Sequence, residues 1–337
     1  MTFRPGALCA LLFVLAGCGP EQPAAPTSAT GGEAKSPVAS AAVTRADLDA
    51  IPKASKPYKI ALIVKTKNNV FFIPMIRAFE ETAKELGVLG EVQAAAQESS
   101  YEQQASLIQS EVEKGVQAIL ITPADSKALV PVLKQAHDKG VLIINLDNRL
   151  DPASVQAQGL SLGGYVGADN QAGGKLAGDA MVAALNGSGN VAVIEGIRGV
   201  DNAEARKRGF ETAVAGKLKV VDEQTGAWET EPAHDKAQAI LAKHSDLAGI
   251  FCANDNMAKG AIKAIEEAGK KGKITVVGYD NIPDVQGLLK SGELSATIEQ
   301  HPDLMGRYGV RMAVGILDGK LKPGGEFLVP LETIKKP

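Results

Sequence analysis

Aromatic residues, cysteine and histidine are scarce in this sequence. Of its 337 residues, 4% are aromatic, three are cysteine, four are histidine and one is tryptophan. Three cysteines are too few for a disulfide framework, and the histidines are scattered, with no two at the spacing of metal ligands. The formal charge of -3 lacks the basic excess of a protein that binds nucleic acid. The sequence therefore predicts no metal, no cofactor and no nucleic-acid partner.

Long hydrophobic runs are also missing, and the run at the N-terminus is short. Arg4 precedes apolar residues over 7–15, and a Leu-Ala-Gly sequence then leads to Cys18. A run of this length is far below the roughly 20 residues that span a bilayer, so residues 1–18 are predicted to be an export signal. They resemble a bacterial lipoprotein signal, in which the cysteine becomes the lipidated first residue. An ordinary signal peptide with an incidental cysteine is the alternative.

Residues 19–57 are rich in Ala, Pro, Ser, Thr and Gly and have no apolar periodicity. This composition predicts a flexible tether with a mean reach on the order of 35 Å. Together with a lipidated Cys18, it predicts a folded part that is anchored to a membrane and stands off its surface. The last cysteine, Cys252, lies in an apolar run and is expected to be buried in a strand.

Beyond residue 57, apolar runs alternate with segments of helical period. Runs such as 60–64 and 141–146 are continuously apolar, which is typical of buried parallel strands. The same alternation begins again near residue 170, so the chain is predicted to form two doubly wound α/β lobes. The elements over 295–331 are too few for a third domain. They are assigned to the first two, so the chain crosses between the lobes more than once.

A ligand site is expected at the polar turn over 65–72, which follows the first predicted strand. The turn carries two ammonium groups, two carboxamides and two adjacent phenyl rings. In an open α/β sheet, ligands bind at the carboxyl ends of the strands, and a cleft between domains suits a small ligand. Neighbouring residues on a helix point about 100° apart, so Phe71 and Phe72 cannot share one buried stripe. The alternative is that one of the two phenylalanines is a core residue of the following helix.

Six passages of the chain, in order and at consistent spacing, resemble one protein family. They are similar to the periplasmic sugar-binding proteins of ABC transporters, the group that contains the ribose-, allose- and galactose-binding proteins, and most of all to its allose-binding branch. The resemblance covers the chain from Tyr58 to its end. The passages are 64–72, 145–151, 193–196, 204–210, 251–258 and 276–280.

The resemblance implies a periplasmic-binding-protein-like fold, with two parallel-sheet lobes joined by three hinge crossovers. The N-terminal lobe would comprise 58–168 and 301–329, and the C-terminal lobe 169–300 and 330–337. Val70 replaces the proline usual in the first passage. Asn148 stands where ribose-type proteins have arginine and allose-type proteins glutamate, so the sugar stays open. The implied ligand contacts are Lys65, Asn69, Phe71, Phe72, Asp147, Asn148, Arg206, Trp228, Asn254, Asp280 and Gln300.

The chemistry of these residue types suits a monosaccharide, which has apolar faces and a polar equator of hydroxyls. Rings suit the faces, carboxylates such as Asp147 and Asp280 can accept hydroxyl protons, and Arg206 can donate in a fixed fork. Each has a simpler alternative. The two aspartates could cap helices, and Arg206 could lie on a solvated face with its basic neighbours. Asn254 could be a turn residue, and Trp228 a loop anchor.

The sequence predicts a binding protein that is not an enzyme: an exported, lipid-anchored component of a sugar ABC transporter in the cell envelope or periplasm. It is expected to be a monomer that delivers a monosaccharide to the transmembrane subunits of a permease. One alternative is a receptor that reports a sugar or a furanone signal to a sensor. The other is an extracellular glycosidase that uses Asp147 and Asp280 as its carboxylate pair.

Overall fold

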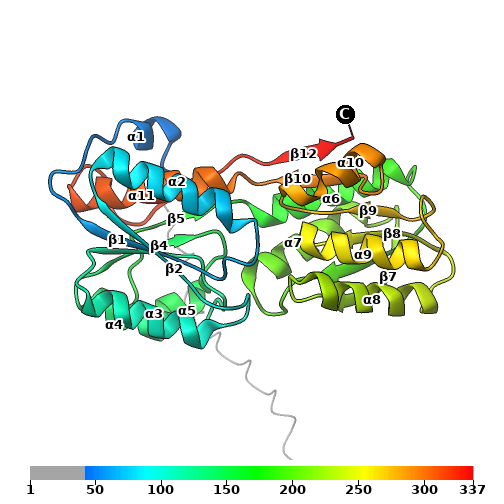
Figure 1. Ribbon diagram of the computed structural model, residues 1–337, viewed down its shortest axis with the longest axis horizontal. Helices are drawn as coiled ribbons and strands as arrows, with labels where there is room; N and C mark the ends of the chain where they lie inside the picture. The colour runs from blue at the N-terminus through cyan, green and yellow to red at the C-terminus, as the bar shows by residue number, and fades with distance from the viewer. Residues whose placement is uncertain (1–41, 337) are drawn as a thin grey trace, which may run out of the picture. The chain divides into compact units, whose positions relative to one another are not determined.

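Two six-stranded sheets organise residues 42–336, the part of the chain that the computed structural model describes. The first sheet has the order β11-β5-β4-β3-β1-β2 and the second β12-β10-β9-β8-β6-β7 (Figure 1). The strands of the first sheet are β1 (Lys59–Val64), β2 (Leu89–Ala94), β3 (Ala118–Ile121), β4 (Leu142–Leu146), β5 (Gly164–Gly167) and β11 (Gly325–Leu328). Those of the second are β6 (Asn190–Glu195), β7 (Lys219–Thr225), β8 (Leu247–Cys252), β9 (Thr275–Val277), β10 (Ala296–Glu299) and β12 (Glu332–Lys335).

The central strands β1, β3, β6 and β8 are buried on both faces, and their sequences are apolar with little alternation. In β1, Ile60, Leu62 and Val64 face one hydrophobic cluster, while Ala61 and Ile63 face another on the opposite side. The named strand pairs are parallel except for β12, which pairs antiparallel with β10. The prediction of two doubly wound parallel-sheet lobes is confirmed.

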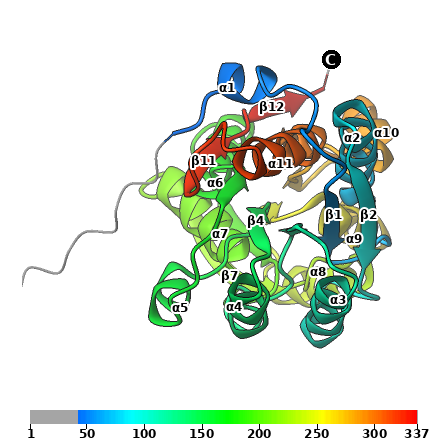
Figure 2. The same ribbon diagram turned by 90° about the vertical axis from the view of Figure 1, so that its left-hand side faces the viewer.

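Helices cover both faces of each sheet. On the first sheet, α2 and α11 pack together on one face, and α3, α4 and α5 lie on the other (Figure 2). In the second lobe, α6 packs against α7 and α8 against α9. The helices of the first lobe are α1 (Arg45–Asp49), α2 (Phe72–Leu86), α3 (Tyr101–Glu113), α4 (Val130–Asp138), α5 (Pro152–Ala157) and α11 (Pro302–Leu317). Those of the second are α6 (Asn170–Ala184), α7 (Asp201–Val214), α8 (Thr230–Lys243), α9 (Asp255–Glu267), α10 (Gln286–Ser291) and the 3-10 turn η1 (Pro283–Val285).

The chain passes between the sheets three times. It leaves the first sheet after β5, returns after β10 to form α11 and β11, and crosses again to β12. The last elements therefore join the two existing lobes. Cys252 ends β8 with 0% exposure and is a free thiol, as predicted for a buried strand position.

The tether predicted over 19–57 is wrong for its final part, because residues 42–57 fold onto the first lobe. Thr44 and Asp47 form a reciprocal capping box at the start of α1. Leu48 is fully buried, and Arg311 of α11 donates to the backbone oxygens of Leu48 and Ile51 at 3.4 and 3.3 Å. A single helical turn has too few residues to show an apolar period, and its stability comes from packing against a distant helix.

The predicted signal peptide, the lipidation site Cys18 and residues 19–41 of the tether lie outside the described residues. Within residues 42–336, none of the helices combines the length and the apolar character that crossing a membrane requires.

We predict that Leu48→Ala lowers the free energy of unfolding by about 2–5 kcal/mol, the usual cost of truncating a fully buried leucine. Urea denaturation of the purified protein measures it. Leu89→Ala is the matched control, because Leu89 is 54% exposed, and it should change stability by less than about 0.5 kcal/mol. A change as small for Leu48 as for Leu89 would show that α1 is not part of the folded lobe.

Candidate ligand-binding site

A cavity lies between the lobes, at the carboxyl ends of strands from both sheets. Its empty volume is about 240 Å³, a figure that includes space open to solvent. Ten of the eleven predicted contacts line it, together with two residues that the sequence analysis missed. The lining residues are Lys65, Asn69, Phe71, Phe72, Glu98, Asp147, Asn202, Arg206, Trp228, Asn254, Asp280 and Gln300.

The polar turn after β1 supplies the rings and the amide of the first lobe. Phe71 and Phe72 are 4% and 1% exposed, and their centroids lie 5.1 Å apart in an edge-to-face arrangement. Both rings thus border the cavity and also belong to the hydrophobic core. Asn69 shapes the turn, because its Oδ1 accepts the Phe71 N–H at 3.1 Å, and its Nδ2 donates to Glu98 at 2.7 Å.

Asp147 follows β4 and turns its carboxyl into the cavity. Its φ of 58° is left-handed, a conformation that few residues other than glycine adopt. The Tyr165 hydroxyl donates to the Asp147 backbone oxygen at 2.7 Å and holds this turn. The capping alternative does not hold, since Asp151 is the N-cap of α5.

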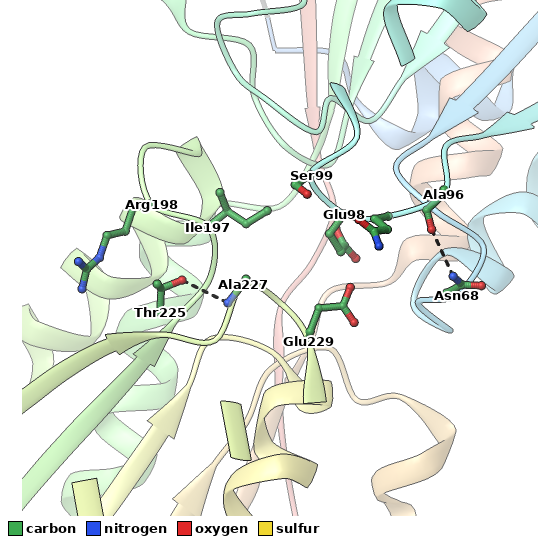
Figure 3. A pocket seen from close by; sticks show the side chains of 10 residues that line it. Asn68, Ala96, Glu98, Ser99, Ile197, Arg198, Thr225, Ala227 and Glu229 are labelled. Carbon is green, nitrogen blue, oxygen red and sulfur yellow. Dashed lines mark hydrogen bonds between the residues drawn. The ribbon is translucent and has the colours of Figure 1, made fainter. Parts of the chain in front are cut away.

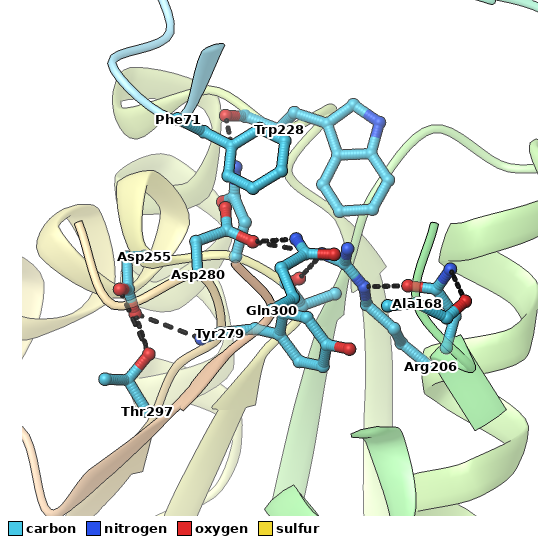
Figure 4. A network of polar contacts seen from close by, with 12 residues as sticks. Phe71, Ala168, Arg206, Trp228, Asp255, Tyr279, Asp280, Thr297 and Gln300 are labelled. Carbon is cyan, nitrogen blue, oxygen red and sulfur yellow. Dashed lines mark hydrogen bonds and ion pairs between the residues drawn. The ribbon is translucent and has the colours of Figure 1, made fainter. Parts of the chain in front are cut away.

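Arg206 lies on α7 and is buried, with 2% of its surface exposed, while its neighbour Arg208 is exposed. Its Nε donates to Asn170 at 2.8 Å, and its Nη1 donates to the Ala253 oxygen at 2.8 Å. The guanidinium also stacks on Tyr279, 3.7 Å from the ring centroid (Figure 4). The solvated-face alternative for Arg206 is therefore wrong.

Asp280 and Gln300 form the polar floor beside Arg206 (Figure 4). Gln300 Nε2 donates to Asp280 Oδ1 at 2.7 Å, and Arg206 Nη1 lies 3.5 Å from the same oxygen. Asp280 follows β9 with a φ of 109°, so its backbone departs from the conformation of a regular strand or helix. Asn254 has two roles, since it lines the cavity and also caps α9 by accepting the Met257 N–H at 2.9 Å.

Trp228 reaches the cavity from the loop between β7 and α8. Ala227 and Trp228 both have positive φ, 51° and 70°, which turns the indole inward to 4% exposure. Gly196 makes room for the ring, because a Cβ there would come within 2.1 Å of it. Asn254 Nδ2 donates to the Trp228 backbone oxygen at 3.1 Å, so the loop is fixed by another lining residue.

Burial dominates the electrostatics of the cavity. It raises the pKa of Asp147, of Glu98 and, most strongly, of Asp280. Positive groups act in the opposite direction: Lys65 lowers the pKa of Asp147 and Glu98, and Arg206 lowers that of Asp147 and Asp280. Burial thus favours the protonated form of the two aspartates, and the two cations favour the ionised form.

Several buried oxygens of the cavity have no hydrogen-bond partner within residues 42–336. They are Oδ1 of Asp147, Oδ1 of Asn202 and Oε1 of Gln300. Buried polar atoms are rarely left unpaired, because each one costs about 1–3 kcal/mol of lost solvation. These three atoms are acceptors, and a further lining residue, Trp228, leaves its Nε1 donor unpaired. The cavity is therefore arranged to receive hydroxyl groups, which both donate and accept.

Glu98 and Asn202 were missed because neither belongs to a local pattern. Glu98 lies in the loop after β2, where it accepts from Asn69 and its Oε2 is 3.9 Å from Lys65 Nζ. Asn202 lies in the first turn of α7, where a polar residue is ordinarily solvated. Its place just after the β6 turn, at the carboxyl end of a strand, was the only available signal.

Asn148 does not line the cavity, contrary to the prediction. Its Nδ2 donates to the Pro123 oxygen at 2.9 Å, and its Oδ1 accepts the Asn202 N–H at 3.2 Å. The left-handed turn at Asp147 sends the two successive side chains in different directions. Asn148 therefore joins the two lobes instead of facing the cavity.

An open groove lies next to the cavity, with Glu98 between the two (Figure 3). Asn68 and Gln97 line it from the first lobe, and Thr225 and Glu229 from the second. Glu98 is the residue that lines both hollows, so its carboxyl lies between the buried site and the groove.

Asp255 lies beside Asp280 and holds the loop that carries it (Figure 4). Its Oδ1 accepts the Tyr279 N–H at 3.0 Å, and its Oδ2 accepts the Ile282 N–H at 3.1 Å. The Thr297 hydroxyl lies 2.9 and 3.0 Å from the two oxygens. The carboxyl thus fixes both ends of the loop that carries Asp280. Burial raises the pKa of Asp255 to about 7, against the effect of these hydrogen bonds.

Comparisons with known proteins point to one family. A family model described as a periplasmic binding protein domain matches residues 60–321. The D-ribose/D-allose-binding protein of Pseudomonas aeruginosa is 36% identical over 285 residues, covering 83% of this chain and 89% of that protein. The D-allose-binding periplasmic protein of Escherichia coli is 33% identical over 75% of this chain and 83% of its own length.

Solved structures agree with these relatives. A periplasmic solute-binding protein of an ABC transporter from Actinobacillus succinogenes, with bound D-allose, has a TM-score of 0.78 and 40% identity, covering 83% of this chain and 98% of that one. A solute-binding protein of an ABC transporter from Agrobacterium vitis, with bound D-fucose, has a TM-score of 0.77 and 30% identity, covering 82% and 95%.

We predict that Asp255 makes the folded protein less stable as the pH rises from about 4 to about 7. Its pKa is raised above the value of about 3.9 expected in the unfolded chain, so the folded state retains the proton over this window. The stability that the proton supplies is present near pH 4 and is lost by pH 7. Unfolding free energies of the wild type and Asp255→Asn across this range measure the difference.

The Asp255→Asn variant should show a flatter pH dependence than the wild type. Asp303→Asn is the control, because that side chain is exposed and makes no hydrogen bond or ion pair within residues 42–336, so the slope should stay unchanged. Equal slopes for the wild type and Asp255→Asn would contradict the raised pKa.

Proposed function

The chain belongs to the periplasmic binding protein family, and on this basis we propose that it captures a monosaccharide between its lobes and delivers it to an ABC permease. The observation that carries the proposal is the cavity itself. Its rings, carboxyls and unpartnered acceptor oxygens suit the apolar faces and the hydroxyls of a sugar. A ligand that touches both lobes stabilises their closed arrangement, because it binds the open one less well.

The proposed ligand is an aldose of pentose or hexose size, with D-allose and D-ribose as the first candidates. Relatives bear the names of these sugars, and the small volume of the cavity favours a single ring. Lys65 and Glu98 add a cation and an acid at the groove side, which can bond hydroxyls of the sugar.

Binding without turnover is the proposed activity. A glycosidase needs two carboxyls with pKa values pushed apart, one held protonated and the other ionised. Here burial raises the pKa of both Asp147 and Asp280, and Arg206 opposes the rise at each of them. Both pKa shifts have the same direction, although that of Asp280 is the larger, and this supports two hydroxyl-binding groups over a divided acid and base.

We further propose that the chain acts as a monomer and meets the transmembrane subunits of its permease while tethered to a membrane. The Leu-Ala-Gly-Cys sequence that ends at Cys18 supports a lipid anchor. Residues 19–41 then serve as the tether, because the folded lobe begins by residue 42.

We predict that D-allose or D-ribose at millimolar concentration raises the melting temperature of the purified protein. Arg206→Lys should weaken that sugar's binding about ten- to hundredfold, since the fork donates charge-assisted hydrogen bonds that lysine cannot reproduce. Isothermal titration calorimetry measures the affinity.

Arg208→Lys is the matched control, being two residues along the same helix and exposed. It should bind the sugar as the wild type does. The proposal fails if no pentose or hexose raises the melting temperature of the wild type. The role of Arg206 fails if both variants retain full affinity.

We predict that Cys18→Ser moves the protein from the membrane fraction to the soluble fraction of expressing cells, because the variant cannot be lipidated at this position. Immunoblots of the two fractions measure the distribution, with Cys252→Ser as the control that should stay in the membrane fraction. A Cys18→Ser protein that remains with the membrane would disprove lipidation at Cys18 as the anchor.

A further inference from the structure

Helix α7 begins without a cap from its own lobe. Its N-cap residue is Val200, whose side chain makes no capping hydrogen bond. The first N–H groups of a helix have no partner within the helix, and a side chain of the N-cap residue ordinarily accepts from them. In α7 the acceptors come from the other lobe. The Asp201 N–H donates to Ser126 Oγ at 3.1 Å, and the Asn202 N–H donates to Asn148 Oδ1 at 3.2 Å.

The two acceptors are held rigidly in the first lobe. Ser126 and Asn148 are 3% and 0% exposed and lie in the loops after β3 and β4. Asn148 Nδ2 donates to the Pro123 oxygen at 2.9 Å and lies 3.4 Å from Ser126 Oγ. The Asp151 N–H donates to the Ser126 oxygen at 2.8 Å. The pair is therefore fixed by contacts within the first lobe and needs no rearrangement to receive α7.

The capped turn carries a side chain that faces the cavity. Asn202 is 3% exposed and lines the cavity, and its Oδ1 has no hydrogen-bond partner within the described range 42–336. Asn202 and Arg206 are four residues apart on α7, so their side chains lie on the same face of the helix. One face of α7 thus presents the Asn202 acceptor oxygen and the Arg206 guanidinium donors to the cavity.

We propose that Ser126 and Asn148 cap α7 across the lobe interface when the lobes close, and that this cap positions Asn202 to accept a hydroxyl of the bound sugar. The inference rests on the proposed function and deepens it. The two cross-lobe hydrogen bonds exist only where the lobes meet, so they favour the closed form. They also fix the backbone of the turn that carries Asn202, and Asn148 acts on the sugar through Asn202 instead of touching it.

The cap is tested with Ser126→Ala and Asn148→Ala, measured with D-allose and D-ribose by isothermal titration calorimetry and stopped-flow dissociation. Each variant should lose about two- to tenfold in affinity, the change expected for one hydrogen bond, and should release the sugar faster. Ser154→Ala is the control, since the Ser154 hydroxyl donates to Asp151 within the first lobe. The melting temperature without sugar should change no more in Ser126→Ala than in this control.

Ser126→Ala tests the cap even if Asn148→Ala does not fold, because it removes only one hydroxyl group. Unchanged affinity in Ser126→Ala, or an equal loss in Ser154→Ala, would overturn the cap. A wild-type protein that binds neither sugar would overturn the proposed function and this inference with it. Wild-type binding that the cap variants leave unaltered would overturn this inference alone.

The contact by Asn202 is tested with Asn202→Ala and a set of monodeoxy analogues of whichever sugar binds. A direct hydrogen bond predicts that the variant's penalty disappears for the one analogue that lacks the bonded hydroxyl, as in a double-mutant cycle. A role confined to the structure of α7 predicts the same penalty for every analogue, and that result would overturn the contact.

Discussion

The second lobe's share of the cavity depends on one buried guanidinium. Arg206 of α7 binds Asn170 at the start of α6, the Ala253 oxygen after β8 and the Asp280 carboxyl after β9, and it stacks on Tyr279. A buried charge is tolerated only where acceptors surround it, so these four elements must meet in one arrangement. The same requirement acts on Asp280, which Gln300 and Arg206 contact and whose loop Asp255 fixes. The need to pair these buried charges therefore determines the geometry of the second lobe's part of the cavity as well as the groups that face a ligand.

The first lobe meets this surface with fewer charges and more rings. Phe71 and Phe72 are packed into the core and still border the cavity, so their position follows from the hydrophobic cluster behind them. Lys65 stands between Glu98 and the Trp228 ring, 3.9 Å from the carboxyl and 5.7 Å from the ring centroid. Burial raises the pKa of the carboxyls around the cavity, and a ligand's hydroxyls can return part of the solvation that was lost.

Neither lobe holds a complete site. Asn256 of the second lobe donates to Asn69 of the first at 3.1 Å, and α7 is capped by Ser126 and Asn148 from across the interface. These bonds and a ligand in the cavity favour the same closed arrangement. The chain crosses between the lobes three times, which limits how far one half can be displaced from the other.

The sequence by itself determined the lobes, because continuous apolar runs and helical periods are local patterns, and through the family resemblance it predicted ten of the residues that line the cavity. It placed the end of the tether wrongly, because α1 is one turn long and depends on Arg311, far along the chain. It missed Glu98 and Asn202 and misassigned Asn148. Only the tertiary structure decided where these three side chains lie. The direction of a loop side chain depends on a left-handed turn such as that at Asp147 and on partners from the opposite lobe.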